Sequence, residues 1–142
     1  MPSLQQQRIA MDAYLRRRTD AIHAFRLLSV VDDMISWSQQ PQPSLEVVTR
    51  TQKQTAIRFA KAGVGKVVWQ VYAHTKCIAV VHFVPRVDSR ISQALFARLR
   101  TLVDPKKVRG TSVPSLALDD FVNPRFRGQV QAELARLIPH IR

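Results

Sequence analysis

The feature that most constrains the fold is a change in apolar spacing along the chain. From Ser3 to about Gln39 there is no glycine or proline, and apolar residues recur every three or four positions, which predicts helix. Between residues 45 and 85, β-branched and aromatic residues gather in short runs separated by turn-forming residues, as in strands. Helical spacing then returns. The sequence therefore predicts an α+β fold whose strands, close together in the chain, form an antiparallel sheet.

The N-terminal helical segment, residues 1–40, is predicted to be one long helix or two abutting helices. Three adjacent arginines at 16–18 interrupt its apolar stripe, and Thr19 or Asp20 could cap a new helix, so the joint is expected there. Pro41 ends the segment because a residue before proline is pushed out of the helical region. The stripe consists of Leu4, Met11, Leu15, Ile22, Phe25, Leu28, Val31 and Ile35.

Four strands are predicted in a meander, at residues 45–52, 54–60, 66–74 and 77–84. Alternation assigns the two faces of the sheet. The core face is expected to carry Thr55, Ile57, Phe59, Val67, Trp69 and Val71. The outward face is expected to carry Arg58, Gln70, Tyr72 and His74.

Two C-terminal helices are expected to pack on one face of this sheet. The first spans about 90–103, with Asp88 or Ser89 as its cap, and the second begins at Pro124 after the cap residue Asn123. The stretch between them, 104–122, reads mostly as loop, with a short strand open at 116–118. A length of 142 residues suits a single domain in which residues 45–142 form the sheet and its helices.

The charge balance predicts a polyanionic partner. The chain has 22 Lys and Arg against 10 Asp and Glu, a net charge of +12, which creates a field that attracts phosphate backbones. Nucleic acid, RNA or DNA, is the expected partner, bound mainly through phosphate contacts without strong base specificity. The protein would then be an accessory factor or a subunit of a larger nucleoprotein assembly.

The candidate phosphate contacts fall in three basic clusters. Cations in the first turn of the last helix oppose its macrodipole, so a bound phosphate would explain them better than helix stability does. The candidates are Arg16, Arg17, Arg18, Lys106, Lys107, Arg109, Arg125 and Arg127. Arg58 and Tyr72 form a second group, because a cation beside a stackable ring on a sheet face is typical of single-strand platforms.

Three motifs resemble cofactor or metal sites but lack the required context. The Gly63–Lys66 stretch resembles a phosphate-binding loop, yet a strand-like run follows the lysine, so a hairpin turn is expected. His74, Cys77 and His82 offer only three zinc ligands. Asp88 with Asp104 is separated by a predicted helix, unlike a nuclease magnesium site. We expect no metal, no cofactor and no enzymatic activity.

Other functions stay open. The long N-terminal helical segment could dimerise or dock a protein partner. A small basic metal-independent RNase or toxin could use Tyr72 and His74. A membrane-surface role fits less well, because the basic residues are spread over several elements. The single cysteine cannot form an internal disulfide and no apolar run is long enough to span a bilayer, so a cytoplasmic protein without a membrane partner is expected.

Overall fold

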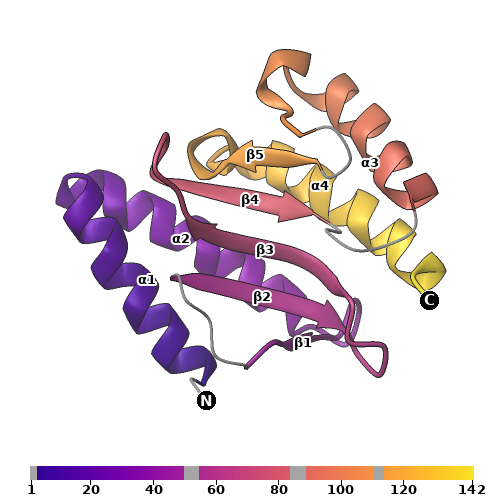
Figure 1. Cartoon of the computed structure of the whole chain (residues 1–142), viewed down its shortest axis with the longest axis horizontal. Helices are drawn as coiled ribbons and strands as arrows, with labels where there is room; N and C mark the ends of the chain where they lie inside the picture. The colour runs from indigo at the N-terminus through magenta and orange to yellow at the C-terminus, as the bar shows by residue number, and fades with distance from the viewer. Residues whose placement is uncertain (1–2, 50–54, 84–88, 111–113) are drawn as a thin grey trace.

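The computed structural model describes residues 3–49, 55–83, 89–110 and 114–142. Its helices and strands confirm the α+β class (Figure 1). In chain order they are α1 (Leu4–Arg18), α2 (Ala21–Ser38), β1 (Leu45–Val47), β2 (Ala56–Lys61), β3 (Val67–Ala73), β4 (Ala79–Phe83), α3 (Ser89–Leu102), β5 (Ser115–Ala117) and α4 (Pro124–Leu137). Short 3-10 helices are η1 (Pro105–Lys107), η2 (Leu118–Phe121) and η3 (Ile138–His140).

The strands form one antiparallel sheet in the order β1-β2-β3-β4-β5, so spatial order follows sequence order. The meander of the first four strands is as predicted, but the prediction of four strands was one too few. The chain returns through α3 and η1 to place β5 beside β4, with Val81 opposite Leu116. A three-residue strand is too short to show alternation, which is why the sequence left it open. The predicted strand ends at Gln52, Gln54 and Val84, and the Asp88 cap, lie outside the described residues.

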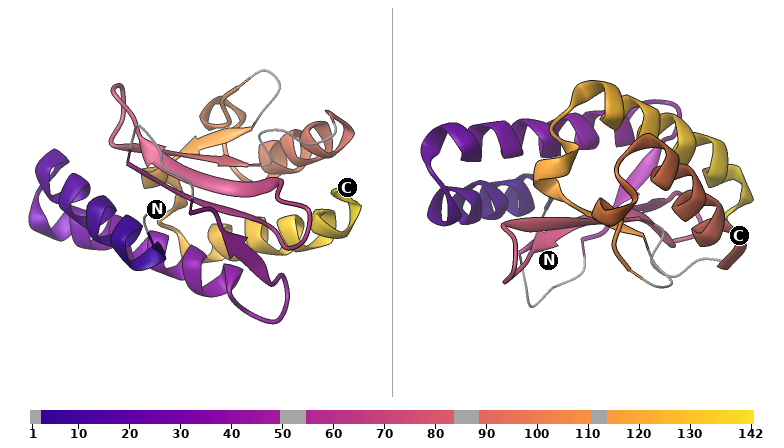
Figure 2. Two further views of the ribbon diagram at one scale, coloured as in Figure 1. Left: turned by 60° about the horizontal axis from the view of Figure 1, so that its bottom comes forward. Right: turned by 90° about the horizontal axis from the view of Figure 1, so that it is seen from above.

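The N-terminal segment is two helices with the joint at the predicted place. Asp20 is the N-cap of α2, and its carboxylate accepts a hydrogen bond from the His23 backbone N–H at 2.9 Å. The two helices fold back side by side (Figure 2) and are joined by an ion pair between Arg8 Nε and Asp32 Oδ1 at 2.6 Å. The cap therefore reverses the chain between the helices.

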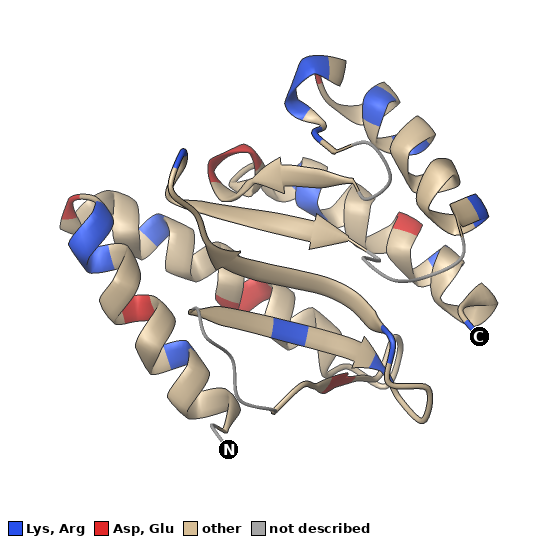
Figure 3. Ribbon diagram, in the orientation of Figure 1, with Lys and Arg blue, Asp and Glu red and all other residues tan. Residues whose placement is uncertain are grey.

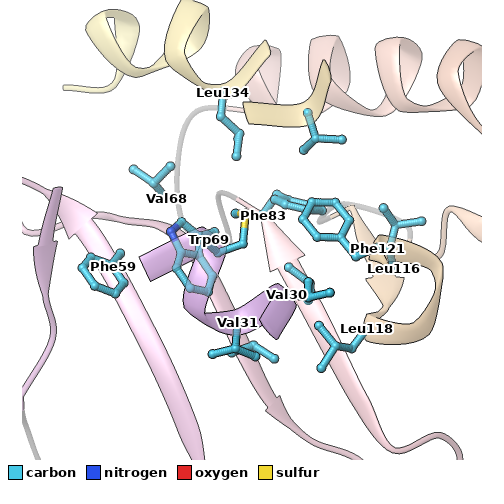
Figure 4. Close-up of a cluster of buried hydrophobic side chains, with 14 of the residues drawn as sticks. Val30, Val31, Phe59, Val68, Trp69, Phe83, Leu116, Leu118, Phe121 and Leu134 are labelled. Atoms are coloured by element: carbon cyan, nitrogen blue, oxygen red, sulfur yellow. The ribbon is translucent and has the colours of Figure 1, made fainter. Parts of the chain in front are cut away.

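The helices are not distributed as expected around the sheet. Figure 2 shows α2 and α4 layered on the same face of the sheet, while α1 lies across one end of the strands. Helix α3 packs alongside α4. Figure 4 shows the resulting core, in which Val30 and Val31 of α2 and Leu134 of α4 meet Trp69 and other side chains of the strands. An N-terminal helix thus supplies much of the cover that was assigned to the two C-terminal helices.

A bulge in β3 changes which residues enter the core. Phe59 lies opposite Trp69, but the next residue of β2, Ala60, lies opposite Val67, so Val68 is the extra residue. Val68 and Trp69 are consequently both buried, while Val67, predicted to be in the core, is half-buried. The prediction for Val67 was wrong because strict alternation does not survive an inserted residue. The indole Nε1 of Trp69 donates to Ser38 Oγ at 2.7 Å, which ties the sheet to α2.

The apolar stripe of the first segment is correct on both helices except beside the joint. Met11 and Leu15 of α1 and Val31 of α2 are buried as expected. Ile22 and Phe25 are instead 71% and 73% exposed. A new helix starts at Asp20, so spacing measured across the break does not predict which face of α2 is buried.

The glycine-lysine stretch is the β2–β3 hairpin turn, as predicted. Gly63 and Gly65 have φ of +77° and +76°, a conformation that favours glycine. The Lys61 N–H donates to the Lys66 carbonyl at 2.9 Å and closes the turn. Strand β3 follows where a phosphate-binding loop would need a helix.

Candidate nucleic-acid interface

Three of the predicted basic residues, Arg16, Arg17 and Arg18, lie in the last turn of α1 at one end of the sheet. We call this the turn end and define it by the β3–β4 turn (residues 74–78), the last turn of α1 and the first two turns of α2. Arg18 donates to the carbonyls of His74 at 3.1 Å and Cys77 at 3.3 Å, so it binds α1 to the β3–β4 turn. Its exposed neighbours, Arg16 and Arg17, are therefore held at the rim of this end.

The second basic cluster lies beside β5 and not at the turn end, because Arg109 pairs with Ser115, which lies opposite His82 near the far end of β4. Lys107 Nζ lies 3.5 Å from Asp120 Oδ1 in η2. Burial raises the pKa of the Cys77 thiol. The positive charges of Arg109 and Arg18 counteract that rise in pKa, whereas the carboxylates of Asp119 and Asp120 add to it. Both guanidinium groups therefore lie within electrostatic range of the β3–β4 turn. Lys106 is exposed on η1.

The third cluster, at the start of α4, divides into an outer and an inner arginine. Asn123 caps the helix by accepting from the N–H groups of Arg125 at 2.9 Å and Phe126 at 3.3 Å. The Arg125 side chain is exposed. The Arg127 side chain is only 13% exposed and its Nε donates to Asp33 Oδ2 at 2.6 Å. The same guanidinium donates to the carbonyls of Phe121 and Val122 at 3.1 and 3.0 Å, so it is engaged within the fold.

Two further cations at the turn end were not among the predicted contacts. Figure 3 shows basic segments at the end of α1, on the neighbouring part of α2 and at the tip of the β3–β4 turn. These include Arg26 of α2 and Lys76 of the turn, both exposed. Lys76 could have been found from sequence, since a lysine in a turn between two predicted strands is exposed by its position.

The outward face of the sheet carries a polar row that crosses four strands. Arg58 of β2 lies opposite Gln70 of β3, Gln70 lies opposite His82 of β4, and His82 lies opposite Ser115 of β5. Arg58 is thus placed on the face predicted for it. It lies along the strands, apart from the arginines of α1.

Tyr72, the other predicted sheet-face residue, pairs with His82. Its hydroxyl lies 2.9 Å from His82 Nε2, and the two rings meet edge to face at 4.9 Å. Burial raises the pKa of the Tyr72 hydroxyl, with a further contribution from Cys77. Burial also lowers the pKa of His82, as does nearby His74. The pair therefore favours a neutral phenol against a neutral imidazole, an arrangement that is hydrogen-bonded within the sheet.

Two other kinds of site receive no support. Within the described residues, no three His, Cys, Asp or Glu side chains lie together as metal ligands would. A shallow groove of about 510 Å³ between α3 and α4 is lined by Ala94, Ala97 and Arg98, and Arg98 pairs across it with Glu133 at 3.8 Å. Small apolar side chains with internally paired charges offer a ligand few specific contacts.

Comparisons with protein-family models, curated proteins and solved structures found no match for the chain. Each helix in the described part of the chain is too short or too polar to cross a bilayer. The function is therefore inferred from the chain's own residues.

Proposed function

We propose that the protein binds nucleic acid, RNA or DNA, through phosphate contacts at the turn end, as an accessory factor or a subunit of a nucleoprotein assembly. One observation carries this proposal: exposed cations from α1, α2 and the β3–β4 turn gather at one end of the sheet (Figure 3). They are Arg16, Arg17, Arg18, Arg26 and Lys76, while Lys106, Lys107, Arg109 and Arg125 lie on other parts of the surface. Contacts to the backbone phosphates do not depend on base identity, so strong sequence preference is not expected.

The side chains at this end differ in how easily they accept a phosphate. Within the described residues, no ion pair involves Arg17, Arg26 or Lys76 at this end, nor Arg125 at the start of α4. Arg16 is paired with Asp12 at 2.8 Å, so a phosphate would have to compete with a carboxylate there. The unpaired cations are the primary contacts, because each phosphate they neutralise releases condensed counterions and breaks no internal ion pair.

The test removes two of these cations and compares the result with a matched change at the far end of the sheet. Lys76 and Lys66 lie in exposed turns at opposite ends of β3. Arg142 belongs to the Lys66 end, because Lys61 Nζ donates to the carbonyl of the preceding residue at 2.7 Å. The test variant is Arg17→Gln with Lys76→Gln, and the control is Arg142→Gln with Lys66→Gln, so net charge falls equally.

Binding is measured by fluorescence anisotropy on a labelled single strand across a salt series, with RNA probes examined afterwards for cleavage. For wild type, log affinity should fall linearly with log salt. The test variant should lower that slope by about 1.4, or about 0.7 for each phosphate that is no longer neutralised, while the control keeps the wild-type slope. Equal effects in the two variants would mean that binding follows net charge alone, and absence of binding at low salt would refute the proposal outright.

A further inference from the structure

The most exposed large apolar side chains in the described part of the chain lie on α2, beside the cations of the turn end. Ile22 and Phe25 are one helical turn apart on the outer face of α2, 71% and 73% exposed. Arg26 follows Phe25 directly, and Arg17 lies just before the joint that leads into α2. We call Ile22, Phe25, Arg17 and Arg26 the α2 corner.

The sequence of α2 offers no folding reason for an aromatic ring at this place. The buried face of the helix is already filled by other apolar residues, among them Leu27, Val31 and Met34. Burying a phenylalanine side chain stabilises a fold, so a ring left in water gives up that stabilisation. An aromatic ring flanked by arginines is instead the composition of single-strand binding surfaces, in which bases stack on rings and cations hold the backbone.

We propose that the α2 corner binds single-stranded nucleic acid, with an unpaired base stacked on Phe25 and adjacent phosphates on Arg17 and Arg26. This inference rests on the proposed function and names its substrate class. In a duplex, the faces of the bases are covered by their neighbours, so Phe25 has nothing to stack on. The corner therefore makes the protein prefer single strands, although the remaining cations bind both forms.

Charge favours nucleic acid over a second copy of the chain at this corner. A second copy would bring its own Arg17 and Arg26 against those of the first, and like charges brought together are destabilising. Two acidic residues near the corner are already engaged, Asp20 as the N-cap of α2 and Asp119 in a pair with His23. Neither arginine has an acidic ion-pair partner among the described residues, and a phosphate backbone would supply one.

The experiment compares Phe25→Ala with Ile9→Ala on a labelled DNA strand of about 15 nucleotides and on its duplex. Ile9 is a matched control, since it is an apolar side chain of α1 that is 57% exposed. Phe25→Ala should weaken single-strand binding roughly 5- to 100-fold and leave duplex binding unchanged, whereas Ile9→Ala should leave both unchanged. Phe25→Trp should restore single-strand binding and add a tryptophan emission that the single strand quenches and the duplex does not.

The outcomes separate this inference from the function on which it rests. If neither probe binds with a salt-dependent affinity, the proposed function fails. If single strand and duplex bind with the same affinity, and Phe25→Ala binds each of them as tightly as wild type does, the proposed function stands and the stacking site is refuted. A change in the sedimentation of Phe25→Ala without nucleic acid would also refute it, because Phe25 would then be a protein docking residue.

Discussion

Arg125 and Arg127 lie two residues apart in the same turn of α4, and the structure predicts opposite roles for them. Arg127 donates to Asp33 and to two backbone carbonyls, whereas the Arg125 side chain is exposed. Replacing each by methionine keeps most of the aliphatic stem and removes the guanidinium. Arg127→Met should therefore destabilise the fold, while Arg125→Met should weaken binding.

The magnitude for Arg127 follows from its contacts. Hydrogen bonds to a charged group contribute about 1.5–3 kcal/mol, and the variant leaves two carbonyls without that donor. The Asp33 carboxylate is 48% exposed, so water screens the ion pair and its share is at most about 1 kcal/mol. We expect the free energy of unfolding to fall by about 2–3 kcal/mol, which lowers Tm by roughly 6–12 °C for a chain of this size. Arg125→Met should change stability by less than about 0.5 kcal/mol.

Urea unfolding followed by circular dichroism measures the stability of the two variants, and the salt dependence of anisotropy measures their binding. Arg125→Met should lower the single-strand slope by about 0.7, and Arg127→Met should leave it at the wild-type value. Two results together would refute the reasoning. Arg127→Met would unfold at the same urea concentration as wild type, and its salt slope would fall by about 0.7, the value expected for Arg125→Met. The Arg127 guanidinium would then point to the ligand, as its place in the first turn of the helix predicts.

Two further predictions concern the core and the sheet face. Ser38→Ala leaves the buried indole N–H of Trp69 without its acceptor and should cost about 1–3 kcal/mol in urea unfolding, most of which should disappear when Trp69→Phe is the background. Burial, with His74, lowers the pKa of His82, so as pH falls below about 6.5 the unfolded chain takes up the proton first and the fold loses stability. His82→Gln should make the urea midpoint fall less between about pH 7 and 5, and an unchanged pH dependence would contradict this explanation.

The sequence predicted well the features that local chemistry determines. The cap at Asp20, the cap at Asn123 and the glycine hairpin each depend on a few neighbouring residues, and each lies where it was expected. Local patterns failed where a distant segment intervenes. The bulge at Val68 changes the phase of β3, and the place of β5 depends on a chain reversal through α3.

The candidate site divides in the same way. The excess of positive charge was predicted because net charge is a property of composition. Several basic residues of the site were named because they are clustered in the sequence. The sequence could not show that Arg127 turns inward, since its partners Asp33 and Phe121 come from other elements. Nor could it show that Phe25 turns outward, because the phase of a new helix depends on how it packs. Exposed aromatic rings near arginines are found only once burial is known.

A net charge of +12 does not make every cation a ligand-binding residue, because many cations already pair with the acidic side chains that the structure describes. Most described carboxylates either cap a helix or pair with a basic side chain: Asp12, Asp20, Asp32, Asp33, Asp104, Asp119, Asp120 and Glu133. The surplus positive charge therefore lies on side chains such as Arg17, Arg26, Lys76 and Arg125. A phosphate that binds them breaks no internal ion pair, whereas one that binds Arg127 must displace Asp33. Nucleic acid is accordingly expected to bind where such cations gather: Arg17, Arg26 and Lys76 lie together at the turn end, whereas Lys66 and Arg142 lie at the opposite end of the sheet.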